Sequence, residues 1–245
     1  MIGGFDLGLQ RAGFEIAWQV EIDPFCRQVL QKHWPDVPKY GDIRELRGDE
    51  LEPVDLICGG FPCQDISEAN TSGRGLEGPR SGLWFEYERL IRKIRPKWVL
   101  VENVSRLLSI NDGRDFGTIL RNLAELWYDA EWSLLSSCAM GAPHTRERLF
   151  IVAHADSKRL QTGWEERIGN DEKIPPGGAN TKYIYSPTIT ISRSRQQTRA
   201  TEPGIPRVAD GIPDRIYRNR AIGNAVDPDV AEIIGRMIIA VEGLT

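Results

Sequence analysis

Short apolar runs alternate with amphipathic segments along the first 155 residues of the chain. Apolar runs bounded by turn residues predict buried strands, and apolar residues that recur every three or four positions predict helices. The strands predicted in this way cover residues 17–21, 40–43, 54–58, 96–104, 131–137 and 149–153. The predicted helices cover residues 5–12, 24–34, 83–94 and 116–127. Strands that alternate with helices at this spacing predict an α/β fold with a mostly parallel sheet.

The alternation stops near residue 156 and resumes only close to the end of the chain. Residues 156–213 show no periodicity and are rich in Gly, Pro, Ser, Thr and Arg. A last amphipathic segment at 230–241 predicts a helix that docks on the sheet. We therefore expect an α/β domain over residues 1–155, a short irregular region over 156–206 and a C-terminal segment over 207–245 that returns to the α/β domain.

Composition places the chain among ordinary soluble proteins. Hydrophobic residues make up 40% of the chain and charged residues 27%, as in most globular domains. No apolar run reaches the ~18 residues of a membrane span, and the first residues lack the pattern of a signal peptide. The four cysteines, Cys26, Cys58, Cys63 and Cys138, show no spacing typical of a zinc site. These features predict a reduced, cytoplasmic protein without a metal or a membrane contact.

The net charge of −4 does not by itself indicate nucleic-acid binding, but the charges are unevenly distributed. Residues 156–220 hold 12 Lys/Arg and 8 Asp/Glu, a balance of +4, which leaves −8 for the remainder. Between residues 173 and 201 there are five basic residues and no acidic one: Lys173, Lys182, Arg193, Arg195 and Arg199. This stretch is either a modest nucleic-acid-binding surface or a solvated loop. The sequence favours neither.

The predicted strand at 54–58 runs into a loop that carries Cys63. Gly59 and Gly60 follow the strand and permit a tight turn with close approach to a ligand. Ligands of open α/β sheets bind at the carboxyl ends of the strands, so the Cys63 thiol is a candidate nucleophile. A free cysteine is more often a small buried apolar residue, and the residues around Cys63 alone do not exclude that alternative.

Four short motifs decide between these readings. They are Gly60-Phe61-Pro62-Cys63-Gln64, Glu102-Asn103-Val104, Arg146-Glu147-Arg148 and Gly223-Asn224-Ala225-Val226, in this order. In this order and at these separations they resemble the signature of the DNA (cytosine-5) methyltransferases of restriction-modification systems and phages. The resemblance covers residues 1–154 and 207–245. It implies a class I S-adenosylmethionine-dependent methyltransferase fold (Rossmann-like, mostly parallel sheet) with a small irregular target-recognition region.

The resemblance also implies a catalytic role for four residues. The Cys63 thiolate would add to carbon 6 of cytosine, and Glu102 would contact ring nitrogen 3 and favour its protonation. Arg148 would lie at the exocyclic oxygen, and Arg146 would help to hold the cysteine and the base. The target base must leave the duplex to reach this site. The loop at 64–82 would then close over the base, with Gln64 and Ser67 near the DNA.

A second group of residues matches the family's binding positions for S-adenosylmethionine, which leaves as S-adenosylhomocysteine. Glu21 ends a predicted strand, where an acid binds ribose in nucleotide-binding α/β folds, and Ile22 would lie beside the adenine. Asp42 and Ile43, at the end of the next predicted strand, match the family's adenine contact. The alternative for Glu21 and Asp42 is an ordinary exposed acid. The matching residues are Gly3, Gly4, Phe5, Glu21, Ile22, Asp42, Ile43, Leu83, Asn224 and Ala225.

The chain departs from the family pattern in two places. The family's first motif begins with an apolar strand, whereas this chain starts at Met1-Ile2-Gly3-Gly4. We therefore expect the first strand to be absent and two strand edges to be exposed. The target-recognition region at 156–206 is very short. Its Arg193, Arg195 and Arg199 could contact phosphates or guanine edges, and the sequence does not assign them. A lesser change is the histidine at His144, where many relatives carry glutamine.

Two other functions remain open. The tRNA-methylating branch of the family carries a Cys-Phe-Thr tripeptide that this chain lacks. A catalytically impaired relative that only binds DNA or a partner would fit the missing strand, while the intact Cys63, Glu102, Arg146 and Arg148 argue against it. The expected partners are double-stranded DNA and a cognate restriction endonuclease in the host. The expected oligomeric state is a monomer.

Overall fold

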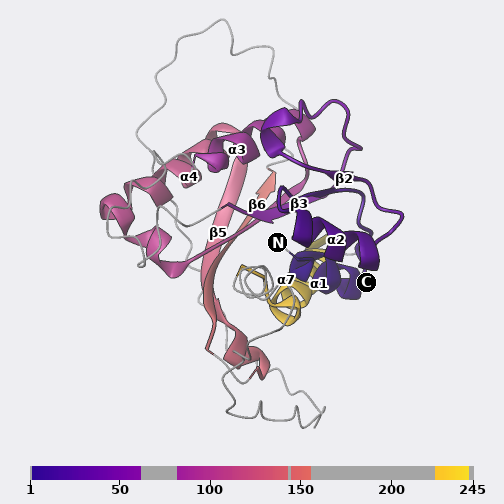
Figure 1. Cartoon of the computed structure of the whole chain (residues 1–245). Helices are drawn as coiled ribbons and strands as arrows, with labels where there is room; N and C mark the ends of the chain where they lie inside the picture. The colour runs from indigo at the N-terminus through magenta and orange to yellow at the C-terminus, as the bar shows by residue number, and fades with distance from the viewer. Residues whose placement is uncertain (1, 62–81, 143–144, 156–223, 243–245) are drawn as a thin grey trace, which may run out of the picture.

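The computed structural model describes residues 2–61, 82–142, 145–155 and 224–242 (Figure 1). Within these residues no helix is long and apolar enough to cross a membrane. The same residues contain no group of three or more His, Cys, Asp or Glu side chains that could hold a metal ion.

A four-stranded sheet forms the centre of the described structure. Its strands lie in the order β3 (Leu56–Gly60), β4 (Trp98–Asn103), β6 (Glu147–Ala155) and β5 (Tyr128–Ser136). β3 pairs with β4 in parallel, whereas β6 pairs antiparallel with both β4 and β5. β3, β4 and β5 therefore run in one direction, and β6 runs in the opposite one.

The prediction of a mostly parallel sheet is correct for strand direction but wrong for strand pairing. Two of the three neighbouring pairs in this sheet are antiparallel. A parallel pair needs a crossover of a dozen or more residues, usually a helix. The connection from β5 to β6 is shorter, and its described part holds only the 3₁₀ helix η5 (Ser137–Met140). β6 consequently returns beside β5 and lies between β5 and β4.

A second, smaller sheet consists of β1 (Gln19–Val20) and β2 (Lys39–Tyr40), paired in parallel. The helix α2 (Pro24–His33) connects them, and the Asp23 carboxylate caps its start by accepting hydrogen bonds from two backbone N–H groups. Within the described residues no strand joins β1 to β3. Among the described residues, β1 and β3 therefore each have one edge without a paired strand, which agrees with the expected exposure of two strand edges.

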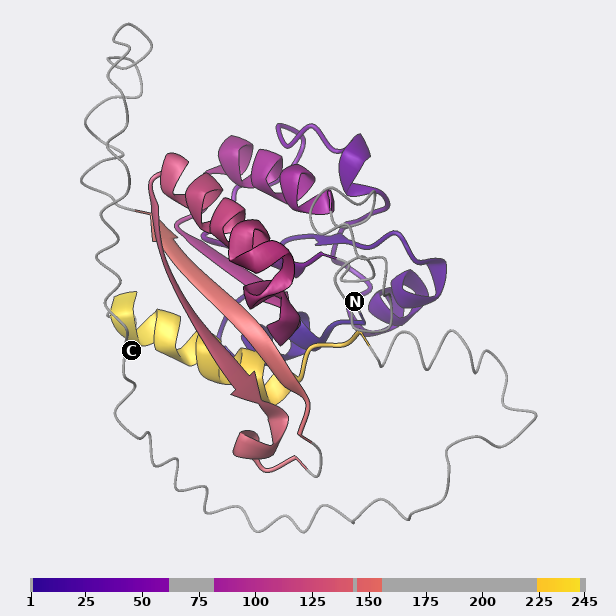
Figure 2. The same cartoon turned by 90° about the vertical axis from the view of Figure 1, so that its left-hand side faces the viewer.

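Helices cover both faces of the four-stranded sheet (Figure 2). α3 (Leu83–Ile94) and α4 (Arg114–Glu125) lie on one face, and α1 (Gly4–Ala12) and α7 (Pro228–Glu242) lie on the other. Side chains of β4 alternate between the two cores. Val99 and Val101 belong to the core under α3 and α4, while Trp98 and Leu100 belong to the core with α1 and α7. Every residue of β4 is buried, so this strand is the centre of the fold.

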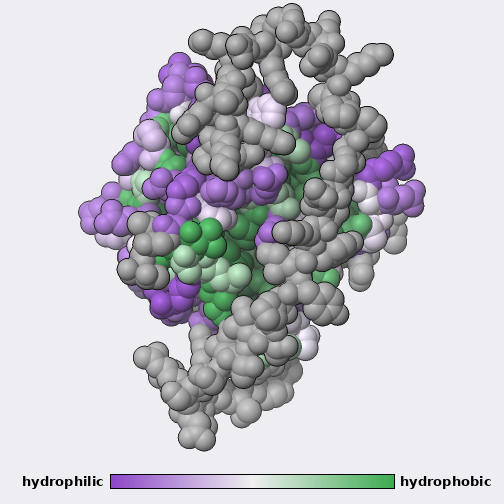
Figure 3. All heavy atoms as spheres, turned by 180° about the vertical axis from the view of Figure 1, so that it is seen from behind, coloured by the Kyte–Doolittle hydropathy of each residue, from purple (hydrophilic) through white to green (hydrophobic). Residues whose placement is uncertain are grey.

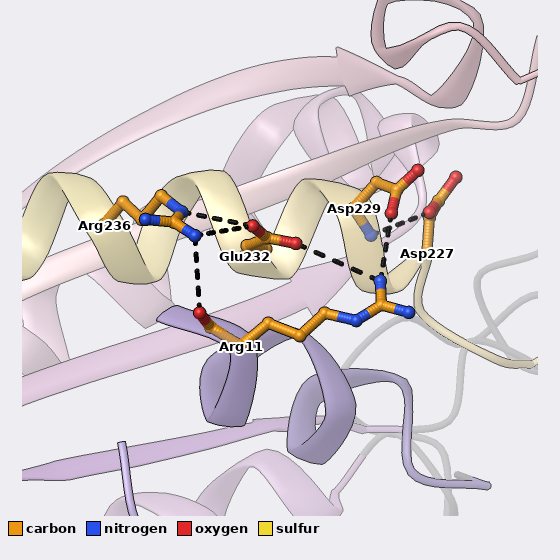
Figure 4. Close-up of polar contacts among 5 residues, drawn as sticks. All are labelled: Arg11, Asp227, Asp229, Glu232 and Arg236. Carbon is orange, nitrogen blue, oxygen red and sulfur yellow. Dashed lines mark hydrogen bonds and ion pairs between the residues drawn. The ribbon is translucent and has the colours of Figure 1, made fainter. Parts of the chain in front are cut away.

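α1 and α7 pack closely because glycines lie at their contact. A Cβ atom added to Gly4 would lie 2.1 Å from the carbonyl oxygen of Val226, and one added to Gly8 would lie 2.4 Å from that of Pro228. Ion pairs border the contact, and Arg11 Nη1 lies 3.2 Å from Asp229 Oδ1 (Figure 4). The predicted docking of the C-terminal helix on the sheet is confirmed.

Most element boundaries differ from the predictions by one to three residues. α3 matches its predicted range, whereas α4 begins two residues earlier than predicted, directly after Gly113 with φ of 77°. The expected turn at Gly59 and Gly60 is wrong, since both residues are the last of β3 and pair with β4. Pairing with a buried neighbour supplies the hydrogen bonds that keep these glycines extended.

Large apolar side chains also reach the surface. Among the described residues they are Ile22, Phe85, Leu134, Met237 and Val241. The face opposite to that of Figure 1 carries a continuous area of hydrophobic residues (Figure 3). Met237 and Val241 are four residues apart in α7, so they share its outward side. α7 is therefore apolar on this side as well as on the side that packs against the sheet.

Candidate active site

The candidate active site lies at the carboxyl end of β4. Glu102 is the fifth residue of this strand, and its neighbours across the sheet are Gly60 of β3 and Phe150 of β6. Glu102 is only 7% exposed. Ionised carboxylates are rarely buried without a partner, so the surroundings of Glu102 determine its protonation.

Arg148 is the ionic partner of Glu102. Its Nε atom lies 3.1 Å from Glu102 Oε1, and the two side chains are 23% and 10% exposed. Burial raises the pKa of Glu102, and the positive charges of Arg148 and Arg146 oppose this rise. Burial is the largest of these effects. Glu102 is therefore a carboxyl group whose protonated form is favoured relative to an ordinary glutamate.

Arg146 stands just ahead of β6, in the same cluster. Burial is the main cause that lowers its pKa, followed by the nearby charge of Arg148, whereas Glu102 and Asp227 raise it. The backbone around Arg146 is held at the β5–β6 end, because Ser137 donates its N–H to the Arg146 carbonyl at 3.1 Å. Two guanidinium groups and two carboxylates thus share one partly buried region.

Asn103 connects this region to the loop that carries the predicted nucleophile. It is 1% exposed, and its Nδ2 atom donates a hydrogen bond of 3.5 Å to the carbonyl oxygen of Phe61. Phe61 is itself 5% exposed and is the last described residue before Pro62 and Cys63. The start of the cysteine loop is therefore held beside the carboxyl end of β4.

Glu21, the predicted ribose-binding acid, and Asp42, part of the predicted adenine contact, lie beyond two neighbouring parallel strands. Glu21 follows β1, and its Oε1 accepts a hydrogen bond of 2.8 Å from the backbone N–H of Asp23. Asp42 follows β2 and caps the 3₁₀ helix η1 (Ile43–Glu45). Hydrogen bonds from Arg44 lower the pKa of Asp42, and the bond from the Arg44 side chain has a larger effect than the one from its backbone N–H. Both acids are placed at strand ends as predicted, and both also stabilise their own turns.

Ile43 begins η1, and the remaining predicted cofactor residues fall into four places. Ile22 is 60% exposed beside Glu21, and Leu83 is the partly buried first residue of α3. Gly3 precedes α1 with φ of 91°. Gly4 and Phe5 begin α1, and the structure buries Phe5 in the core that α1 and α7 share. Asn224 and Ala225 lie just ahead of α7, next to the Val226 carbonyl that approaches Gly4. α1 thus brings the first and last of these segments together.

Comparison with known proteins identifies the family. The family model for C-5 cytosine-specific DNA methylase matches residues 1–198. The chain belongs to this family.

Curated relatives of the chain are named as type II methyltransferases. M2.BsuMI of Bacillus subtilis (strain 168) is 38% identical over 156 residues, 62% of this chain and 39% of the relative. M1.ScrFI of Lactococcus lactis subsp. cremoris is 32% identical over 213 residues, 83% of this chain and 54% of the relative. M.HhaI of Haemophilus parahaemolyticus is 29% identical over 230 residues, 90% of this chain and 69% of the relative. The chain spans about half the length of the first relatives, 39%, 49% and 54%.

Solved structures show the same fold. A prophage-encoded E. coli protein, described as a DNA modification methyltransferase, matches with a TM-score of 0.54 and 25% identity, over 71% of this chain and 49% of that one. A mutant DNMT2 of Spodoptera frugiperda matches with a TM-score of 0.52 and 20% identity, over 71% of this chain and 53% of that one. The class I methyltransferase fold expected for the chain is therefore confirmed.

Several predicted site residues of the chain lie outside the described residues. They are Cys63, Gln64, Ser67, His144, Arg193, Arg195 and Arg199. Of the four predicted catalytic residues, the structure brings Glu102, Arg146 and Arg148 together.

One charged residue at this site was not predicted. Asp227 follows Val226 and comes directly before α7, and it lines a small pocket together with Arg146 and Arg148. An acid beside the fourth motif was visible in the sequence. Its proximity to the arginines depends on how α7 packs, so the sequence carried no signal for it.

Proposed function

We propose that the chain transfers a methyl group from S-adenosylmethionine to carbon 5 of a cytosine in double-stranded DNA. The observation that carries this proposal is the buried pair of Glu102 and Arg148 at the carboxyl end of β4. Asn103 holds the start of the cysteine loop beside that pair. An acid of raised pKa, a neighbouring cation and a candidate thiol are the groups that activation of a cytosine ring requires.

In the proposed mechanism Cys63 acts as the nucleophile. Its thiolate forms a bond to carbon 6 while Glu102 protonates ring nitrogen 3, so the ring becomes an enamine that is nucleophilic at carbon 5. Glu102 takes this proton back from nitrogen 3 when the cysteine leaves. Arg148 donates to the exocyclic oxygen, and Arg146 favours the thiolate over the thiol by its charge. Carbon 5 then takes the methyl group, a base removes the carbon 5 proton, and the bond from carbon 6 to sulfur breaks.

The described residues on the β1–β2 side fit S-adenosylmethionine. Glu21 follows β1, at a strand end where ribose hydroxyls are bound in this class of fold. Asp42 follows the neighbouring parallel strand β2, where it would contact the adenine. Ile22 offers an exposed apolar side chain beside Glu21 for an adenine ring. We propose that Gly3, Gly4, Phe5, Ile43, Leu83, Asn224 and Ala225 complete this site. The bound group supplies an activated methyl on sulfur, and the product is S-adenosylhomocysteine.

We propose that the substrate cytosine leaves the duplex, because carbon 6 is not accessible to a thiol within stacked bases. Gln64 and Ser67 would contact the DNA near this base. The basic residues from Lys173 to Arg199, which include Arg193 and Arg195, would neutralise phosphates in the target-recognition region at 156–206. A chain of this kind acts as a monomer and, in its host, protects DNA from a cognate endonuclease.

The test is methyl transfer by the 245-residue chain. The purified protein is incubated with S-adenosylmethionine and a duplex of random sequence, and methylated positions are mapped by bisulfite sequencing. We expect methylation at a defined sequence, and we expect its loss in Cys63→Ser. A duplex with 5-fluorocytosine at the mapped position should trap a covalent adduct, detected by its mass, because fluorine cannot leave as the carbon 5 proton does.

A second candidate function is DNA binding without methyl transfer. The observation that favours it is that, among the described residues, β1 and β2 form a sheet separate from the main one. The proposed cofactor-binding side then depends on a sheet of only four paired residues. DNA binding by both wild type and Cys63→Ser, with methylation by neither, would support this candidate. A parallel reaction with a tRNA transcript tests the third candidate function, methylation of tRNA. Methylation of the transcript and not of the duplex would overturn the proposal that DNA is the substrate.

A further inference from the structure

Two consecutive glycines at the start of α1 face two different neighbours. A Cβ atom added to Gly3 would lie 2.6 Å from Cζ3 and 2.8 Å from Cη2 of Trp34. One added to Gly4 would lie 2.1 Å from the carbonyl oxygen of Val226. All three distances are shorter than van der Waals contact. The turn at Gly3–Gly4 is therefore enclosed between the end of α2 and the segment that leads into α7.

The backbone and the side chain of Trp34 are both held in place. α2 ends at Trp34, because a residue followed by proline, here Pro35, disfavours helical backbone. The N–H of Trp34 donates to the carbonyl oxygen of Leu30 at 2.8 Å, and Lys39 of β2 donates from Nζ to the carbonyl oxygen of Trp34. The indole Nε1 donates a hydrogen bond of 3.2 Å to Gln10 Oε1 in α1. The ring is thus fixed to α1, α2 and β2.

Gly3 needs such a neighbour to keep its conformation. Its φ of 91° and ψ of 21° lie in the left-handed region. A glycine adopts this region and the ordinary one about equally well, so its own chemistry does not select either. The Trp34 ring and Cδ2 of Leu30, which would lie 3.3 Å from an added Cβ, occupy the space on one side of Gly3. The surrounding side chains therefore select the conformation.

We propose that Trp34 is a positioning residue, whose ring fixes the Gly3–Gly4 turn in the conformation that binds S-adenosylmethionine. The proposal rests on the proposed function, which assigns this turn to the cofactor. Trp34 acts through Gly3, so its ring need not touch the cofactor. Without the ring, the turn must be ordered when the cofactor binds, and this ordering lowers affinity.

Three variants separate this role from simple packing. Trp34→Ala removes the ring. Trp34→Phe keeps a flat ring at the same position and loses only the hydrogen bond to Gln10. The matched control is Trp18→Ala, because Trp18 directly precedes β1 and packs against the core under α3 and α4. Its Nε1 donates a hydrogen bond of 2.9 Å to the carbonyl oxygen of Glu52.

The first measurement is binding of S-adenosylhomocysteine to the 245-residue chain by calorimetry, below the unfolding midpoint of each variant. We expect Kd to rise by about tenfold or more in Trp34→Ala, because the turn is no longer preorganised. In Trp34→Phe it should stay within about twofold of the wild type, because a flat ring is kept. Trp18→Ala should lower the unfolding midpoint and leave Kd unchanged. An unchanged Kd in Trp34→Ala, or an equal rise in Trp18→Ala, would overturn the proposal.

Hydrogen exchange gives a readout without cofactor. The N–H of Leu7 donates to the carbonyl oxygen of Gly3 at 2.9 Å, so its exchange reports on the turn. It should exchange faster in Trp34→Ala than in the wild type and Trp34→Phe, and Trp18→Ala should leave it unchanged. Trp34→Leu, which keeps apolar volume without a flat ring, replaces Trp34→Ala if that variant does not fold. Equal exchange and equal Kd in Trp34→Leu and Trp34→Phe would contradict the positioning role.

Activity separates this proposal from the proposed function. In an active enzyme, Trp34→Ala should raise KM for S-adenosylmethionine and leave kcat at saturation nearly unchanged. A wild type that methylates DNA, with the same Kd and KM as Trp34→Ala, would refute the role of Trp34 alone. A wild type that binds S-adenosylhomocysteine without methylating DNA, and binds it more weakly in Trp34→Ala, would refute methyl transfer and leave the role of Trp34 standing. A wild type that binds no S-adenosylhomocysteine would refute both.

Discussion

The carboxylate of Glu102 and the guanidinium of Arg148 lie 3.1 Å apart on neighbouring antiparallel strands. The two residues are 46 positions apart in sequence, and they meet because β6 pairs with β4 rather than following it in parallel. Burial raises the pKa of Glu102 even though this cation opposes the rise. The pair therefore combines a proton donor with a fixed positive charge at one strand end.

Loss of Arg148 should affect both the rate of the proposed reaction and its pH dependence. Arg148→Met removes a charged donor, which we expect to lower kcat by roughly a hundredfold. It also removes a charge that lowers the pKa of Glu102, so the alkaline limb of the kcat profile should move to higher pH. A downward shift in Arg148→Met would contradict the assigned roles.

Ionisation of Asp6 should lower the free energy of unfolding as the pH rises above the ordinary pKa of an aspartate. Burial raises its pKa above 3.8, and its hydrogen bond with Gln19 Nε2, at 2.7 Å, opposes this rise. Because the pKa of Asp6 is higher in the folded than in the unfolded state, its contribution to the stability of the fold is fully present below pH 3.8. This contribution is lost as the pH rises through the pKa of the folded state.

Asp6→Asn removes this titration. The free energy of unfolding of the wild type, relative to Asp6→Asn, should fall between about pH 4 and neutrality, as measured by urea unfolding at several pH values. Asp112→Asn, at a side chain that is 98% exposed, is the control for loss of one surface charge. Curves that stay parallel for Asp6→Asn and the wild type would disprove the assignment.

The glycines between α1 and α7 should be intolerant of a methyl group. Gly8→Ala would place Cβ 2.4 Å from the Pro228 carbonyl oxygen, which is backbone and cannot move alone. We expect a loss of about 2 kcal/mol or more in the free energy of unfolding. Gly117→Ala in α4 is the matched control, because no atom lies within 4 Å of the added Cβ. It should be neutral or stabilise by up to about 1 kcal/mol.

Hydrogen exchange should follow the arrangement of the two sheets. Every residue of β4 is buried, and β4 pairs with β3 on one side and β6 on the other. Its amides should therefore exchange most slowly. The two-residue β1–β2 ladder should exchange faster by orders of magnitude, because short, separate pairings open locally. Equal protection of Val20 and Leu100, measured by mass spectrometry, would show that the two sheets unfold as one unit.

Local patterns in the sequence were sufficient to predict elements whose own apolar residues pack into the core, such as α3 and β4. α3 was predicted with its observed ends because its apolar residues recur at helical spacing. β4 was predicted from its apolar run, and Glu102 at its end followed from the same run together with the family motif. The extent of β1 was overestimated, since a strand also needs a neighbour, and β1 pairs with β2 over only two residues.

The sequence by itself determined the family, the order of the motifs and the strand-end position of Glu102. Only the tertiary structure decided that β6 runs antiparallel between β4 and β5, that Arg148 meets Glu102, and that Asp227 shares a pocket with Arg146. Strand order and helix docking depend on contacts between residues far apart in the chain, and no local period records which neighbours will meet. The charges of this site were readable from the sequence, but their pairing became visible only once the sheet and α7 had brought them together.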